Sequence, residues 1–543
     1  MDENFVPVNW MSPDYWEIQD TRGTFHGTDG NFKDASVRLV QEEDGGVTVR
    51  VQASCPLSAV RLRWNCEDLI RGKKIFGDAW ERGYGDMEWS GASAARILPW
   101  YFLLFSEKDR KVLGIGVKVQ PSAFCFWQAD TAGISLYMDI RCGGEGVCLD
   151  GRTLSVCTIV ARDYENLSAL EAGRKFCQVM CPDPILPPHP VYGSNNWYYA
   201  YGDSSQEAIL QDTDLLAQLT SGNANRPYMV IDDGWQKERK PEGTYIGGPW
   251  REGNSRFLDM QALAGEIRRR GAIPGIWLRP LLNDSPEIPA SWKLSCRDCL
   301  DPTVPEALAF VREDIRTLCE NGYRLIKHDF STFDLTGKWG FEMHPLVTDR
   351  GWHFADRSCT TAEAVILLYK AILQAAAPYG ALILGCNTVG HLGAGLMHMD
   401  RVGDDTSGIG WERTRSVGVN TLAFRLMQHD TFFAVDADCV GITGKIAWEQ
   451  NRQWAEAVAR SGTALFLSVK PGVLTDAQMR ELSQIMAMAS RGEHHAVPLD
   501  WTENTCPDLW QDGEEVIRYH WYPAAGVTFA PDRNLYTARL TDY

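Results

Sequence analysis

The chain has 543 residues, of which 44% are hydrophobic and 23% charged, so it is expected to be a soluble globular protein of two or three domains. Its 53 basic and 71 acidic residues give a net charge of −18, which argues against nucleic acid or an anionic membrane surface as a partner. The fifteen cysteines lack the spacing of a disulfide framework, which predicts reduced thiols. The start at Met1–Asn4 is unlike a signal peptide, which predicts a cytoplasmic location.

The first part of the chain is expected to be all-β up to about residue 182. Short apolar or alternating stretches are separated by turns, at Val37–Val40, Val47–Val51, Trp100–Phe105, Val112–Val119, Ile134–Ile140 and Thr153–Val160. Many short strands with regular turns predict a β-sandwich. We assign this N-terminal domain to residues 1–185.

A stiff, proline-rich connector at Pro182–Pro190 precedes a different pattern. Eight apolar runs then alternate with amphipathic stretches, and Ser204–Glu207 and Thr360–Glu363 have the capping-box pattern of helix starts. The expected strands are Val191–Trp197, Tyr228–Asp233, Ile273–Pro280, Tyr323–Asp329, Ala381–Asn387, His398–Asp405, Thr431–Asp438 and Thr463–Ser468. Eight strand–helix units predict a (β/α)₈ TIM barrel over residues 186–492.

The end of the chain is expected to complete the barrel and add a small domain. A helix over Asp476–Arg491 closes the ring of helices, and Glu515–Tyr522 and Asn534–Leu540 have strand patterns. The expected fold is therefore multidomain α/β, with a central TIM barrel, an N-terminal β-sandwich and a small C-terminal antiparallel β-domain over 493–543. The longest apolar stretch, Ala364–Cys386, contains Lys370 and Pro378 and does not predict a membrane span.

Several predicted barrel strands end in aspartate. These residues are Asp232 and Asp233 after the second strand, Asp329 after the fourth, Asp404 and Asp405 after the sixth, and Asp436 and Asp438 after the seventh. A single one would be an ordinary helix N-cap. Because barrel active sites lie at the C-terminal ends of the strands, four such ends gather carboxylates whose repulsion costs stability unless function requires it.

Two kinds of chemistry use converging carboxylates. Metal-assisted hydrolysis normally adds histidine ligands, for which only His328 and His398 lie at strand ends, and Cys296–Cys299 lacks the second half of a zinc site. Glycoside hydrolysis needs two facing carboxyl groups, about 5–5.5 Å apart for retention of configuration, and benefits from aromatic walls. The carboxylates and the 20 tryptophans favour a glycosidase that needs no metal or other cofactor.

The strand ends also form an ordered set of motifs. They are Ser194–Trp197, Ile231–Trp235, Ile326–Asp329 with its Lys-x-Asp pattern, Arg401–Asp405 with its Arg-x-x-x-Asp pattern, and the stretch 435–468. In this order they resemble glycoside hydrolase clan D, chiefly family 36, the α-galactosidases and their relatives. The chain departs from many members at Ile276–Pro280, which has Arg-Pro instead of Glu-Pro, and at Gly385–Thr388, which lacks a following glycine run.

The resemblance implies a role for each matching residue. Asp329 would be the nucleophile and Asp405 the acid/base, with Asp404 as the rival for that role. The expected substrate-binding residues are Asp232, Asp233, Trp235, Lys327, Arg401, Cys386, Trp197 and Trp277. Structural alternatives are an ion pair for Lys327 or Arg401, a cap for an aspartate, an inert thiol for Cys386 and core packing for the tryptophans.

Three further segments are expected near the substrate. Gln236–Phe257 and Ser331–Thr360 are long insertions at the active end of the barrel, where such insertions commonly cover a ligand. The polar, aromatic and glycine-rich segment Gly77–Asp86 is expected to reach the pocket from the sandwich, with an ordinary exposed loop as the alternative.

The expected function is that of a retaining, exo-acting α-galactosidase-like hydrolase of terminal α-linked sugars, which works through a glycosyl-aspartate intermediate. The alternatives are a transglycosidase of the raffinose-synthase type, an α-N-acetylgalactosaminidase, a non-catalytic carbohydrate-binding barrel and a metal-dependent barrel hydrolase. The expected partner is a carbohydrate substrate. The sequence leaves open whether the chain forms a homo-oligomer.

Overall fold

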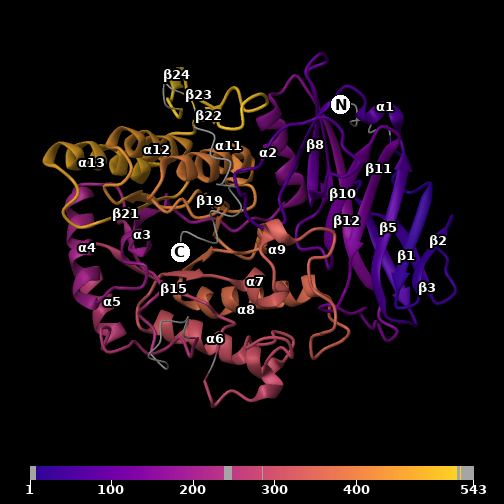
Figure 1. Ribbon diagram of the computed structural model, residues 1–543, viewed down its shortest axis with the longest axis horizontal. Helices are drawn as coiled ribbons and strands as arrows, with labels where there is room; N and C mark the ends of the chain where they lie inside the picture. Colours follow the sequence, from indigo (N-terminus) through magenta and orange to yellow (C-terminus); the bar gives the residue numbers. More distant parts are fainter. Residues whose placement is uncertain (1–7, 238–246, 284, 523–525, 527–543) are drawn as a thin grey trace.

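The computed structural model describes residues 8–237, 247–283, 285–522 and 526. Two six-stranded antiparallel sheets come first, a parallel barrel follows, and a three-stranded antiparallel sheet comes last. In Figure 1 the sandwich lies at the right in indigo and purple, and the barrel with its surrounding helices lies to its left. The fold class expected from the sequence is therefore confirmed.

The sandwich consists of two sheets whose inner strands, such as β8 (Tyr101–Ser106) and β9 (Lys111–Val117), are buried over most of their length. One has the order β2 (Gly23–Gly27), β1 (Tyr15–Asp20), β5 (Leu57–Asn65), β11 (Gly133–Asp139), β10 (Phe124–Asp130) and β7 (Leu98–Pro99). The other has the order β3 (Ala35–Gln41), β4 (Val47–Ala53), β12 (Leu154–Glu165), β9, β8 and β6 (Lys74–Gly77). The expected hairpins are present as β3–β4 and β8–β9.

The expectation that this part is all-β is wrong at α1 (Glu67–Ile70) and α2 (Ala169–Met180). Ser168 and Glu171 form a capping box at the start of α2 and satisfy amides of its first turn. The buried face of α2 includes Phe176, which packs so closely on β9 that a Cβ at Gly114 would lie 2.5 Å from its ring. The Ser-x-x-Glu spacing is a helix signal that the strand pattern around it obscured.

The barrel contains the eight expected strands in parallel register. They are β13 (Tyr192–Asn195), β14 (Tyr228–Ile231), β15 (Ile273–Leu278), β16 (Leu325–His328), β17 (Leu382–Gly385), β18 (Met399–Arg401), β19 (Ala434–Asp436) and β21 (Leu465–Val469). β21 pairs with β13, and the amide of Ala464 donates to the carbonyl of Val435 (2.9 Å), which closes the ring. A ninth strand, β20 (Val440–Ile442), lies beside β21. Most strands stop before the polar residues at their expected ends, because the chain turns out of the ladder there.

Helices surround the barrel. They are α3 (Trp197–Ala200), α4 (Gln206–Leu219), α5 (Met260–Arg269), α6 (Pro305–Glu320), α7 (Ser331–Thr336), α8 (Thr361–Ala376), α9 (Gly390–Gly393), α10 (Trp411–Arg413), α11 (Asn420–Arg425), α12 (Trp448–Ser461) and α13 (Asp476–Arg491). The capping box at Thr360 is confirmed, whereas α4 is capped by Ser205, one residue later than expected, through the amide of Ala208. α13 has the expected bounds and packs against α12 and α4.

The last described sheet consists of β22 (Val497–Pro498), β23 (Leu509–Asp512) and β24 (Glu515–Arg518). β24 is the first part of the expected strand Glu515–Tyr522, and the expected strand Asn534–Leu540 lies outside the described residues. Arg460 of α12 forms an ion pair with Asp512 (3.0 Å) and ties this sheet to the barrel.

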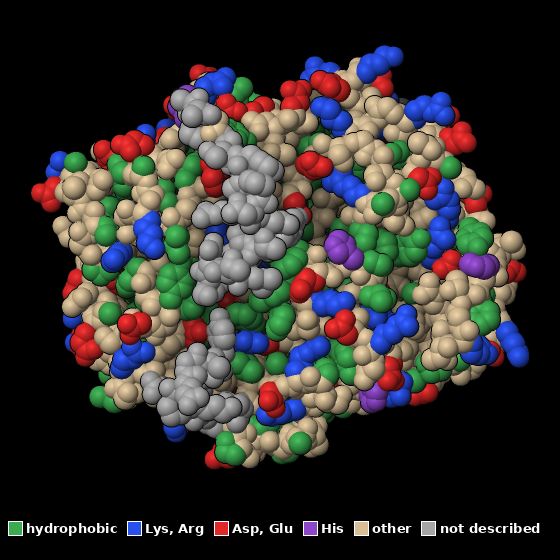
Figure 2. Space-filling view, in the orientation of Figure 1, with side chains coloured by type: hydrophobic (Ala, Val, Ile, Leu, Met, Phe, Trp, Pro, Cys, Tyr) green, Lys and Arg blue, Asp and Glu red, His purple; other side chains and the backbone are tan. Residues whose placement is uncertain are grey.

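The described chain has charged side chains on its surface (Figure 2), and its cysteines are unpaired. On the face seen in Figure 2, acidic and basic side chains are interspersed. Within the described part of the chain, each helix is too short or too polar to cross a bilayer. All fifteen cysteines are free thiols, including Cys296 and Cys299.

Candidate active site

A cavity of about 460 Å³ lies at the C-terminal ends of the barrel strands. Most of its lining lies at the ends of β13 to β18 or directly after them, and the rest comes from the sandwich and from the segments after β16 and β18. The lining residues are Arg82, Tyr84, Trp197, Asp232, Asp233, Trp277, Arg279, Lys327, Asp329, Phe330, Phe333, Trp339, Phe341, Cys386, Asn387, Arg401, Asp404, Asp405 and Arg413.

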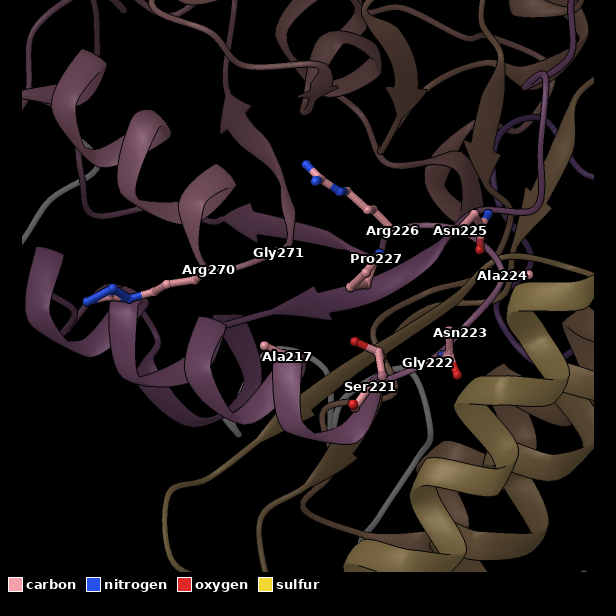
Figure 3. A pocket seen from close by; sticks show the side chains of 11 residues that line it. Ala217, Ser221, Gly222, Asn223, Ala224, Asn225, Arg226, Pro227, Arg270 and Gly271 are labelled. Atoms are coloured by element: carbon pink, nitrogen blue, oxygen red, sulfur yellow. The ribbon is translucent and has the colours of Figure 1, made fainter.

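A second cavity, of about 280 Å³, lies at the opposite end of the barrel, between the end of α4 and the start of β14 (Figure 3). Its polar lining includes Asn223, Asn225, Arg226 and Arg270. None of its described lining residues is acidic, so the converging carboxylates belong to the first cavity.

On one side of the first cavity, Asp232 and Lys327 form a buried ion pair between the ends of β14 and β16. Lys327 Nζ lies 2.7 Å from Asp232 Oδ2, which also accepts a hydrogen bond from Asn195 Nδ2 (2.6 Å). The backbone amide of Asp232 donates to Asn196 Oδ1 (2.8 Å). Burial disfavours the lysine charge, but the field of Asp232 outweighs it and holds the pKa of Lys327 well above its usual value. This corner therefore offers both a cation and a carboxylate.

Asp233 lies beside this pair, and its negative charge is stabilised less than that of Asp232. Burial raises its pKa to about 6, although Gln236 Nε2 donates a hydrogen bond to Asp233 Oδ1 (2.6 Å). The nearby charges of Asp232 and Asp329 act in the same direction as burial. Asp233 is thus a carboxyl group whose proton is exchanged near neutral pH.

Asp329 is fixed in place by three hydrogen-bond donors. Trp277 Nε1 donates to its Oδ2 (2.8 Å), while Asn387 Nδ2 and the amide of Phe330 (2.6 Å) donate to its Oδ1. Phe330 has a φ of 63°, a left-handed conformation that bends the chain back immediately after the carboxylate. The three donors hold the carboxylate in one orientation in the cavity.

Asp404 and Asp405 follow β18 and are surrounded by arginines. Asp404 pairs with Arg82 (3.3 Å) and Arg413 (3.1 Å), and Asp405 pairs with Arg401 and, at 3.7 Å, with Arg82. The side chain of Asp405 is 20% exposed, against 7% for Asp404. Burial would raise the pKa of Asp405, but the guanidinium groups of Arg401 and Arg82 outweigh it and lower that pKa. Asp405 is therefore the more accessible of the two, and it is ionised when the cavity is empty.

The segment Gly77–Asp86 reaches the cavity from the sandwich, as one of the two sequence interpretations expected. The amide of Gly83 donates to the carbonyl of Val402 (2.7 Å), and its own carbonyl accepts from the amide of Asp404 (3.0 Å). These bonds extend the ladder beyond β18 and bring Arg82 to the carboxylates.

A second anchor joins this segment to the insertion after β16. Glu81 accepts hydrogen bonds from Tyr84 Oη (2.6 Å) and from the amide of Gly340 (2.8 Å). A Cβ at Gly340 would lie 2.8 Å from the Glu81 side chain, so the close approach of the two segments needs a glycine there. The two segments thus form one wall of the cavity.

No family model matches the sequence. The fold is similar to that of an α-galactosidase from Thermus thermophilus in complex with stachyose, with a TM-score of 0.57, 18% identity and coverage of 83% of this chain and 97% of that one. The galactosidase domain of an α-galactosidase–sucrose kinase has a TM-score of 0.61 and 14% identity, with coverage of 95% of this chain and 81% of that one. A family 36 α-galactosidase from Geobacillus stearothermophilus has a TM-score of 0.56 and 13% identity, with coverage of 93% of this chain and 80% of that one. The chain has the fold of the family 36 α-galactosidases.

Within this family 36 fold, all but one of the expected substrate-binding residues line the cavity. Trp197, Trp277, Cys386 and Arg401 do so together with the aspartates and Lys327. Burial raises the pKa of the Cys386 thiol well above its usual value, so this side chain is a neutral wall and not a thiolate.

Trp235 is the exception, and its expected place as a pocket wall is wrong. It is fully buried, its Nε1 donates to the carbonyl of Trp277 (2.8 Å), and Trp277 lines the cavity whereas Trp235 does not. Trp250, from the insertion Gln236–Phe257, packs edge-on against Trp277 in the same layer. β14 ends at Ile231, and Gly234 before Trp235 has a φ of 106°, so strand alternation does not predict on which side this ring lies.

The two histidines weighed as metal ligands do not line the cavity. Burial lowers the pKa of His328 to about 4, and its ring packs against Tyr369. His398 Nδ1 accepts a hydrogen bond from the amide of Ile383 (3.1 Å). In the described ranges, no group of three or more His, Cys, Asp and Glu side chains is arranged to hold a metal ion.

Several lining residues were not predicted from the sequence. They are Arg279, Phe330, Phe333, Phe341, Asn387 and Arg413. Asn387 follows β17 and could have been found by the rule that located the aspartates, since it is the polar residue at a strand end. Arg279 follows β15, where it pairs with the buried Asp334. The phenylalanines carry no local signal of function.

Proposed function

We propose that the protein is a retaining, exo-acting α-glycosidase, and specifically an α-galactosidase. The observation that carries the proposal is that Asp329 and Asp405 line one cavity at the barrel mouth, together with the charged side chains of Asp232, Asp233 and Lys327. The similarity of the fold to α-galactosidases with bound sugars supports it. The proposed steps use only side chains of the chain itself.

In the first step, Asp329 attacks the anomeric carbon while the bond to the leaving group breaks. Asp405 gives its proton to the departing oxygen, and a glycosyl-aspartate forms. Asp405 must first take up a proton, because Arg401 and Arg82 lower its pKa in the empty cavity. A glycosidic oxygen placed between Asp405 and Arg82 would weaken their 3.7 Å contact and favour the protonated form.

In the second step, a water molecule replaces the leaving group. Asp405 takes a proton from the water, whose oxygen attacks the anomeric carbon and releases Asp329. Two displacements restore the original configuration. Asp232, Asp233 and Lys327 would bind the hydroxyls of the sugar, and Trp277 would pack on its apolar face.

A panel of p-nitrophenyl glycosides tests the proposal. We expect release of p-nitrophenol from the α-galactoside, no dependence on divalent cations, and little release from β-glycosides. Galactose should appear first as the α-anomer by NMR. Preferential cleavage of the α-N-acetylgalactosaminide would change the proposed sugar, and transfer to an added sugar without hydrolysis would change the proposed acceptor. Both results would leave the double displacement through Asp329 and Asp405 in place. Binding of all the sugars without turnover, or activity that a chelator abolishes, would refute the proposal.

The pKa of Asp233 predicts an acidic limb in the pH profile of kcat/KM. Below about pH 6 its carboxyl is protonated and accepts weaker hydrogen bonds from a substrate hydroxyl, so kcat/KM is expected to fall as the pH decreases through that value. In Asp233→Asn this limb should disappear. Asp212→Asn is the matched control, since burial raises the pKa of Asp212 to about 7 but the residue lies in α4, away from the cavity. An unchanged limb in Asp233→Asn would contradict the assignment.

A further inference from the structure

One side of the cavity is formed by aromatic rings. Phe330, Phe333, Trp339 and Phe341 come from the chain after β16, and Tyr84 comes from the sandwich; we call these five residues the aromatic wall. The rings of Phe333 and Trp339 are stacked with centroids 4.7 Å apart, and Phe330 lies 5.6 Å from Trp339. Tyr84 meets Phe341 edge-on at 5.0 Å. These contacts form two groups of rings, and all members except Tyr84 are only half-buried.

The position of the aromatic wall relative to Asp405 indicates that the wall contacts the leaving group of the substrate. The guanidinium carbon of Arg82 lies 5.4 Å from the ring centroids of both Tyr84 and Trp339, and Arg82 also contacts Asp405 at 3.7 Å. In the proposed reaction Asp405 protonates the glycosidic oxygen. Groups that extend from Asp405 through Arg82 therefore surround what departs, whereas Asp232 and Lys327 surround the sugar that is transferred.

The chemistry of the wall favours a flat apolar group. A ring face packs on another ring or on the apolar face of a sugar, as proposed for Trp277, but a sugar also needs hydrogen-bond partners for its hydroxyls. Among the described lining residues on this side, the charged side chains are Arg82, Arg279, Asp404 and Arg413. Arg82 and Arg413 are paired with Asp404 at 3.3 and 3.1 Å, and Arg279 is paired with Asp334. A sugar leaving group would have to compete with these ion pairs.

We infer that the leaving-group subsite binds an aromatic aglycone, so that the preferred substrates are α-glycosides of phenols or similar aryl alcohols and not sugar–sugar linkages. This inference rests on the proposed function, because it takes Asp405 as the acid. It makes Trp339 and its neighbours residues that determine specificity without taking part in bond cleavage.

The test compares three α-galactosides with the same transferred sugar: the phenyl glycoside, the methyl glycoside and an α-1,6-linked galactosyl-glucose. In Trp339→Ala, kcat/KM for the phenyl glycoside is expected to fall by about tenfold, while the values for the other two change by less than about threefold. Because wild type and variant are compared on the same substrate, differences in leaving-group ability between the substrates do not affect the result. Trp339→Phe should restore most of the loss because it retains a ring. Phe25→Ala, at an exposed ring of β2, is the control.

The outcomes separate the inference from the function on which it rests. An equal loss on all three substrates, or a larger loss on the disaccharide, would overturn the aromatic subsite and leave the glycosidase intact. If the wild-type chain cleaves none of the three, the proposed function fails, and titration calorimetry with the same glycosides tests the subsite. Tighter binding of the phenyl glycoside that is lost in Trp339→Ala would retain the subsite, and equal affinities would overturn it.

Discussion

In Asp329→Ala, kcat on an aryl α-galactoside is expected to fall by about 10⁴-fold or more. The substitution removes the group that attacks the anomeric carbon, which is the carboxylate that Trp277 and Asn387 hold in place. KM should change much less, because the carboxylates proposed to bind hydroxyls stay in place. Asp329→Asn is the companion variant, since it preserves the side-chain shape and should show the same loss. Thermal melting of both variants checks that the fold is intact.

Added azide turns this loss into a test of the role. In Asp329→Ala the small anion can occupy the vacated space and attack the sugar from the face that Asp329 would use. The expected product is the β-galactosyl azide, with restored turnover of a substrate that has a good leaving group. A variant with more than about a tenth of the wild-type kcat, or rescue that yields the α-galactosyl azide, would show that Asp329 is not the nucleophile.

The second large effect is expected in Asp405→Ala, and its size should depend on the leaving group. A general acid contributes about 10²- to 10⁴-fold when the departing oxygen is strongly basic. We therefore expect a loss of about 10³-fold on methyl α-galactoside but a much smaller loss on a dinitrophenyl α-galactoside, whose phenolate leaves without a proton. Steady-state kcat/KM on the two substrates measures the difference. Azide should give the α-galactosyl azide in this variant, because it attacks the intermediate from the opposite face.

Asp404→Ala is the matched comparison, because it removes the adjacent carboxylate. Asp404 holds Arg82 and Arg413 but is less exposed than Asp405. Its loss should reduce activity on both substrates by a similar factor, since it would disturb the arginines without changing proton transfer. If Asp404→Ala shows the dependence on leaving group and Asp405→Ala does not, the two residues exchange roles.

Much of the barrel could be predicted from the sequence. Runs such as the apolar Tyr228–Ile231 and Leu325–His328, which begins with two apolar residues, are long enough for a strand, and the polar residues that follow them must lie where the chain leaves the ladder. That rule alone brings Asp232 and Asp329 to the same end of the barrel. The family resemblance then assigns their roles, which stay predictions until the variants are measured.

The sequence was less informative where burial depends on packing. Trp277 lies within β15 and Trp235 comes four residues after β14, and only Trp277 lines the cavity. Gly234 turns the chain before Trp235 with a φ of 106°, and the buried ring donates its Nε1 to the carbonyl of Trp277. α2 was missed for a related reason, since its helix signal is one short capping box that is followed by residues compatible with either structure.

The sequence by itself determined the order of the domains, the strands and the carboxylates at their ends, because strand periodicity and chain reversal are local properties. Only the tertiary structure decided which side chains meet across domains. Arg82 reaches Asp404 and Asp405 because Gly83 adds its backbone to the end of β18, and Gly340 is close enough to Glu81 to complete the aromatic wall. Such contacts depend on how two distant segments dock, and neither segment carries that information alone.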